Sequence, residues 1–119
     1  MKILIVDDSS VMRKIVSRGL RQAGLEADEV LEAGDGQEAL STLSDNVVDL
    51  ILCDWNMPNM DGLTFVKELR KGDDTPVVMI TTEGGESKVN EAVSSGANGH
   101  IKKPFTPADL KGTLGPFFK

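Results

Sequence analysis

The chain lacks the features that usually mark secreted or membrane proteins. It contains a single cysteine, Cys53, so no disulfide can form within it. No apolar stretch approaches the roughly 20 residues needed to cross a membrane, and the start of the chain shows no apolar stretch followed by a small-residue cleavage site. We therefore expect a cytoplasmic protein with no membrane partner.

Positive charge is also scarce. The sequence has 13 Lys and Arg against 19 Asp and Glu, for a formal net charge of -6. General nucleic-acid binding depends on cationic side chains that neutralise phosphates, so this balance argues against it. Proteins, cations and small molecules are the expected partners.

The hydrophobic pattern predicts one α/β domain over residues 1–119, with no output domain. Two domains in 119 residues would each be too small for a comfortable core. Short apolar runs alternate with segments of helical period, which is typical of βα units around a parallel sheet. The expected strands are 3–6, 27–33, 50–53, 77–80 and 99–102, and the expected helices are 12–23, 35–43, 62–69, 86–95 and 110–118.

The polarity of the strands predicts their order. Strands covered by helices on both faces are continuously apolar, whereas edge strands are more mixed. The second and fifth runs, 27–33 and 99–102, are the mixed ones and belong at the edges. This favours a flavodoxin-like, doubly wound sheet of five parallel strands in the order 2-1-3-4-5.

Two of the expected helices have weak patterns. The fourth carries only Val89, Ala92 and Val93 as apolar anchors, so it should be loosely held. In the last segment, the glycines and proline within 112–116 oppose a regular helix. That segment should bend or fray before the end of the chain.

Polar residues directly follow four of the five apolar runs. Asp7 and Asp8 follow the first, Asp54 the third, Thr81 the fourth and Lys103 the fifth. Because ligands bind beyond the carboxyl ends of the strands in open parallel sheets, these side chains should converge on one pocket. The plainer interpretation of a single acid at such a place is that it caps the following helix.

Three carboxylates in one pocket predict a cation. Like charges about 4 Å apart repel by roughly 4 kcal/mol at an effective dielectric constant near 20. Mg²⁺ prefers oxygen ligands from one or two carboxylates, waters and a phosphate. A carboxylate can itself be a nucleophile that forms an aspartyl phosphate, so the pocket with its lysine suggests phosphoryl transfer.

Four segments together resemble the receiver domain of bacterial response regulators, and the resemblance covers essentially the whole chain. They are Val6-Asp7-Asp8-Ser9, residues 54–62 with the sequence DWNMPNMDG, Thr81-Thr82-Glu83 and Lys103-Pro104-Phe105. Within that family, the likeness is strongest to the free-standing chemotaxis regulators.

The resemblance implies how the pocket is used. Asp54 would accept a phosphoryl group from a sensor histidine kinase. Asp8 and Asp54 would ligate Mg²⁺, Asp7 would help to hold the ion, and Asn56 would add its backbone carbonyl as a ligand. Such a protein catalyses only its own phosphorylation and autodephosphorylation and is otherwise not an enzyme.

The resemblance also assigns switch residues. Thr81 and Lys103 would hold the phosphoryl oxygens, and the peptide before Pro104 is often cis in such proteins. Asn56 and Glu83 would tune the phosphoryl lifetime. His100 stands where receivers usually carry a Tyr or Phe that swings inward as the threonine moves.

The signal would leave through a binding surface. The resemblance implies a downstream protein target on the fourth helix, fifth strand and fifth helix, and a phosphatase as a further possible partner. Lys88, Lys102 and Lys111 could give that surface a positive cast.

Three other functions fit parts of the sequence. A phosphorelay intermediate that passes its phosphoryl group to another histidine is favoured by His100 and opposed by Asn56. A Mg²⁺-dependent phosphatase with an aspartyl-phosphate intermediate would place its nucleophile in a DxD motif, whereas this chain has Asp7-Asp8-Ser9 and no cap insertion. A flavin or nucleotide carrier lacks support because neither GxGxxG nor GxxxxGK occurs.

Overall fold

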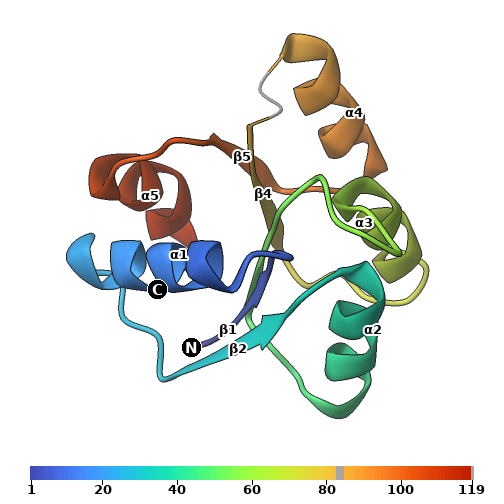
Figure 1. The fold of residues 1–119 in the computed structure, drawn as a ribbon, viewed down its shortest axis with the longest axis horizontal. Coiled ribbons are helices and arrows are strands. Elements are labelled where there is room, and N and C mark those ends of the chain that lie inside the picture. The colour runs from blue at the N-terminus through green and yellow to red at the C-terminus, as the bar shows by residue number, and fades with distance from the viewer. Residues whose placement is uncertain (83–84, 119) are drawn as a thin grey trace.

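The computed structural model describes residues 1–82 and 85–118, and it alternates five strands with five helices (Figure 1). The strands are β1 (Lys2–Val6), β2 (Glu29–Ala33), β3 (Leu50–Cys53), β4 (Val77–Thr81) and β5 (Gly99–Lys102). The helices are α1 (Ser10–Gln22), α2 (Gly36–Asp45), α3 (Gly62–Leu69), α4 (Glu86–Ser95) and α5 (Pro107–Leu114). A 3₁₀ turn, Gly115–Phe117, follows α5.

The strands form one parallel sheet in the order β2-β1-β3-β4-β5, which confirms the predicted order. β3 and β4 are buried at every position, while β2 and β5 are mixed and lie at the two edges. β2 begins at Glu29 rather than at Ala27, because its pairing with β1 starts where Lys2 faces Glu29.

Helices cover both faces of the sheet, so the core has two halves (Figure 1). α1 and α5 pack on one face, where Ile3 and Ile5 of β1 point. α2, α3 and α4 pack on the other, where Leu4 and Val6 point. The alternation of side chains along a strand explains this division, because successive residues face opposite sides of the sheet.

Local signals fix the helix ends much as the sequence predicts. Ser9 caps α1 by accepting a hydrogen bond from the Met12 N–H, and Asp35 caps α2 in the same way through the Glu38 N–H. Gly24, just beyond α1, has a φ of 77°, a conformation that glycine adopts readily.

The two helices with weak patterns behave differently. Ala92 is the only buried residue of α4, and Val93 is 54% exposed, so α4 has few apolar anchors, as expected. Leu110 and Leu114 of α5 are fully buried, and the chain tightens into the 3₁₀ turn where irregularity was predicted. In the part of the chain that the structure describes, no helix is long and apolar enough to span a membrane.

Candidate functional site

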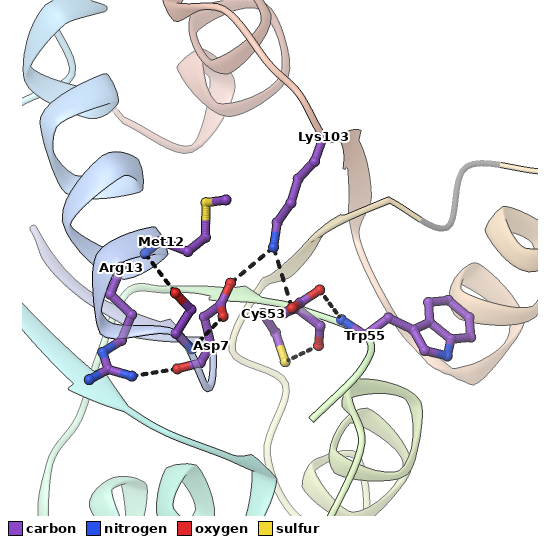
Figure 2. Close-up of polar contacts among 8 residues, drawn as sticks. Asp7, Met12, Arg13, Cys53, Trp55 and Lys103 are labelled. Carbon is purple, nitrogen blue, oxygen red and sulfur yellow. Dashed lines mark hydrogen bonds and ion pairs between the residues drawn. The ribbon is translucent and has the colours of Figure 1, made fainter. Parts of the chain in front are cut away.

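An acidic pocket lies at the carboxyl ends of β1 and β3 (Figure 2). The pairing of Val6 with Cys53 makes the residues after these strands neighbours. The Asp54 N–H donates to the Val6 carbonyl at 2.9 Å, and the Asp7 N–H donates to the Ala33 carbonyl at 3.0 Å. The register of the sheet therefore places both aspartates at the carboxyl-terminal ends of neighbouring strands.

Three carboxylates converge in this pocket. Asp7, Asp8 and Asp54 each offer one oxygen, and these oxygens all lie within 4.8 Å of one another. Asp7 is buried, Asp54 is half-buried and Asp8 is exposed, so the cluster opens to solvent on the Asp8 side. Several hard oxygen donors beside open solvent suit Mg²⁺, which keeps some of its waters when it binds protein.

Lys103 brings a positive charge to the pocket from the end of β5, which lies beyond β4 in the sheet. Its Nζ lies 3.0 Å from Oδ2 of Asp7 and 3.3 Å from Oδ2 of Asp54 (Figure 2). The Lys103 N–H also donates to the carbonyl of Thr81 at 2.8 Å, and the peptide between Lys103 and Pro104 is cis, as expected. The lysine thus links the strand ends of β4 and β5 to both aspartates.

Asp54 has an unusual electrostatic environment. Burial raises the pKa of its carboxyl group, the Lys103 ammonium opposes that change, and the charge of Asp7 adds to it. The Trp55 N–H donates to Oδ1 of Asp54 at 2.7 Å. One carboxylate oxygen is therefore held by a backbone donor, and the other faces the lysine.

The loop after β3 is held by close backbone contacts. A Cβ on Gly62 would lie 2.1 Å from the Asp54 carbonyl oxygen, so no larger residue fits there. The Gly62 N–H donates to the Trp55 carbonyl at 2.8 Å. Farther along, Asn59 has a φ of 65° and its side-chain amide donates to Asp35 at the start of α2. These contacts fix the backbone on either side of the pocket.

Arg13 is a neighbour of the pocket that the sequence analysis missed. One guanidinium nitrogen donates to the Asp7 carbonyl at 2.5 Å, and Nε donates to Glu32 at 2.8 Å. The Ser9 N–H donates to Oδ1 of Asp7 at 2.9 Å. The sequence did contain a signal for this contact. A helix capped by Ser9 starts beside the pocket, and Arg13 lies one turn into that helix.

Trp55 links the pocket to α4. Its side chain is buried, and the Nζ of Lys88 lies 5.1 Å from the centroid of its ring. A cation at this distance from an aromatic face is attracted to it. Lys88 is exposed on α4, so it can contribute to the surface there while its ammonium also lies over Trp55.

The remaining predicted residues are placed as follows. Thr81 is fully buried at the end of β4, and His100 is partly buried in β5 opposite Met79. Asn56 is exposed in the loop after β3. Glu83 lies outside the described residues.

Comparison with known proteins identifies the family. The sequence model of the response regulator receiver domain matches residues 3–114. The chain belongs to this family. It follows that the receiver is a signalling protein rather than a conventional enzyme, and that the pocket is the acidic pocket of a receiver.

Curated relatives of this receiver are chemotaxis proteins. The Chemotaxis protein CheY homolog of Campylobacter jejuni is 48% identical over 118 residues, covering 96% of this chain and 89% of the relative. Chemotaxis protein CheY1 of Helicobacter pylori is 47% identical over 118 residues, covering 96% and 94%.

Solved structures share the fold of the receiver. Chemotaxis response regulator CheY4 of Vibrio cholerae matches with a TM-score of 0.82 at 42% identity, covering 98% of this chain and 97% of that one. The CheX-CheY-BeF3-Mg complex from Borrelia burgdorferi matches with a TM-score of 0.87 at 29% identity, covering 100% and 90%. The predicted fold class is thereby confirmed.

Proposed function

We propose that this receiver is a phosphorylation-controlled binding switch in chemotaxis. A sensor histidine kinase donates a phosphoryl group to Asp54 in a Mg²⁺-dependent reaction, and the modified protein binds a downstream target. The observation that carries the proposal is the convergence of three carboxylates with the ammonium of Lys103. The names of the curated relatives support chemotaxis as the pathway. Because the kinase uses cytoplasmic ATP, the proposal places the receiver in the cytoplasm.

Asp7, Asp8, Asp54 and the backbone carbonyl of Asn56 would hold the metal. When bound, Mg²⁺ supplies positive charge that neutralises the phosphoryl oxygens and orients them for in-line transfer. The cluster of oxygens within 4.8 Å supports this assignment, since such donors suit a hard divalent cation. The magnesium in the solved Borrelia burgdorferi complex points the same way.

Asp54 acts as the nucleophile in the proposed transfer. A carboxylate oxygen forms a bond to phosphorus while the bond between phosphorus and the imidazole nitrogen of the donor breaks. The Trp55 N–H holds one oxygen of Asp54 and so fixes the plane of the carboxylate. Correct positioning of this kind supplies much of the catalysis in phosphoryl transfer.

Lys103 has a different partner before and after transfer. Before transfer it is paired with Asp7 and Asp54. Transfer converts the Asp54 carboxylate into an acyl phosphate, whose oxygens carry about two negative charges near neutral pH. The Lys103 ammonium then pairs with one phosphoryl oxygen, and the Thr81 hydroxyl donates a hydrogen bond to a second one.

The proposed output passes from Thr81 to α4, β5 and α5. Movement of Thr81 changes the space available to His100 on the neighbouring strand β5. α4 is loosely held, with Ala92 as its only buried residue, so a small free-energy difference can shift its position. The surface formed by these three elements would bind the target, and Asn56 and Glu83 would set how long the signal lasts.

A phosphorelay intermediate is the second candidate. The observation that favours it is His100 in β5, where receivers that act as switches usually carry Tyr or Phe. Such a protein would pass its phosphoryl group to a second histidine rather than bind a target.

A phosphatase is a further proposed partner of the switch. The solved CheX-CheY complex supports the idea that receivers of this kind bind other proteins.

Direct phosphorylation tests the acceptor. The receiver is incubated with Mg²⁺ and a small acyl-phosphate donor, and intact-protein mass spectrometry measures a labile gain of one phosphoryl group. Asp54→Asn should abolish the gain, whereas Asp74→Asn, an exposed carboxylate before β4, should retain it. Equal labelling of wild type and Asp54→Asn would refute the assignment.

A further inference from the structure

A groove of about 380 Å³ lies between α1 and the edge strand β2. α1 packs against β1 and α5, so it does not cover the outer part of β2. Arg13 and Glu32, which pair with each other, form the end of the groove nearest the acidic pocket. The groove belongs to a different surface from the target-binding surface on α4, β5 and α5.

One wall of the groove is strongly basic. Lys14, Arg18 and Arg21 follow one another at steps of four and three residues, which places them on one side of α1. In residues 1–82 and 85–118, none of these three forms an ion pair with an acidic side chain. A cluster of available cations is notable on a chain with a net charge of -6.

A mainly apolar pocket adjoins the groove. Val30 lines the groove, and it also lines this smaller pocket of about 110 Å³ beside Leu20, Leu25 and Ala27. The occupant should therefore combine negative charge along its length with at least one apolar side chain. A small inorganic anion would leave this apolar pocket unfilled.

We propose that the groove binds an extended acidic segment of a partner protein. The carboxylates of the segment pair with Lys14, Arg18 and Arg21, and an apolar side chain enters the smaller pocket. A protein segment is favoured over nucleic acid because the smaller pocket beside Val30 can take an apolar side chain, which a sugar-phosphate backbone does not offer. Lys14, Arg18 and Arg21 follow one another along α1, so an extended chain that runs beside the helix can pair with all three.

Binding of synthetic probes tests the occupant. Fluorescence anisotropy compares a labelled peptide of Glu and Leu, the same peptide with Gln for Glu, the same peptide with Ala for Leu, and a single-stranded DNA oligomer. The Glu and Leu peptide should bind best, and it should shift the backbone amide NMR signals of residues 14–21 and 29–32. Equal binding of the Gln peptide, equal binding of the Ala peptide, or tighter binding of the DNA would overturn the proposal.

Charge reversal tests the location. The double variant Lys14→Glu/Arg18→Glu should weaken peptide binding by about tenfold, in line with two exposed charge pairs lost and replaced by repulsion. The matched control Lys67→Glu/Lys71→Glu makes the same change in net charge with two exposed lysines, one in α3 and one in the turn after it. Circular dichroism melting should show that both variants fold. The same loss of binding in both would refute a site in this groove.

Discussion

The ammonium of Lys88 lies over the ring of Trp55, 5.1 Å from its centroid, and so joins α4 to the residue that follows Asp54. The same Trp55 donates its backbone N–H to the Asp54 carboxylate. A change at Asp54 therefore has a short physical route to α4, through one residue and one side-chain contact. α4 needs such a contact, because Ala92 is its only buried residue.

Removing the Lys88 charge should loosen α4. Lys88→Met keeps most of the side-chain length but loses the attraction to the ring, which for an exposed cation is worth about 0.5–1 kcal/mol. We expect unfolding in urea to show a loss of that size, together with a shift in Trp55 emission. Lys67→Met, on an exposed position of α3 away from Trp55, is the control. Identical emission spectra for Lys88→Met and wild type would show that the contact does not persist in solution.

Asp8 should be required for a metal response. Because Trp55 adjoins the pocket, Mg²⁺ is expected to change its fluorescence in wild type. Asp8→Ala removes an exposed carboxylate of the cluster, so it should fold normally and respond much less. A magnesium titration followed by Trp55 emission measures this difference. If both proteins responded alike, the ion would have to bind elsewhere.

Asp54 should make the protein less stable as pH rises when Mg²⁺ is absent. Its pKa is raised above the ordinary value of 3.8, so the folded state binds the proton more tightly than the unfolded state. Its contribution to stability is therefore favourable at low pH and lost as pH rises from about 4 through the folded pKa. Asp54→Asn should remove this dependence and raise the melting temperature near pH 7 by a few degrees.

Thermal unfolding of both proteins across pH checks this prediction. The difference in melting temperature between Asp54→Asn and wild type should widen as pH rises from 4 to 7 and shrink when Mg²⁺ is added. A variant markedly less stable than wild type at neutral pH would contradict the view that the carboxylates repel one another.

Gly62 should resist any substitution. A Cβ there would lie 2.1 Å from the Asp54 carbonyl oxygen, so the backbone that carries the acceptor must move. Gly62→Ala is expected to cost about 3 kcal/mol in the free energy of unfolding, at the upper end of the usual cost of overpacking. Gly72→Ala is the matched control, since a Cβ at Gly72 would meet nothing within 4 Å. Chemical denaturation compares the two, and equal stabilities would mean that the loop adjusts freely.

The sequence predicted the fold and the pocket where short-range rules decide the outcome. Continuous apolar runs identified the inner strands, and their mixed neighbours identified the edges, because burial on two faces leaves little choice of residue. Asp7, Asp54 and Lys103 could be brought together in advance for a similar reason, since parallel strands end at a common edge. Their chemical roles came from the resemblance to receivers rather than from these rules.

Contacts made by long side chains could not be predicted in the same way. Arg13 reaches Asp7 and Glu32, and Lys88 reaches Trp55, only because particular rotamers span gaps between separate elements. The order of residues in the sequence does not determine how far apart these side chains lie in the folded protein. The groove beside β2 was missed for a related reason: its basic wall is visible along α1, but the gap that exposes it depends on how α1 packs against β1 and α5.

The sheet order has a consequence for assembly. β2 and β5 are opposite edges of the sheet, and the residues that line the proposed groove belong to α1 and β2, whereas the proposed target surface is formed by α4, β5 and α5. Two proteins can then occupy the receiver together without sharing surface. A partner tethered at one edge would hold the receiver near its own complex and raise the effective concentration for the second partner. The domain would then bridge two partner proteins directly, as well as carry a signal by diffusing from one to the other.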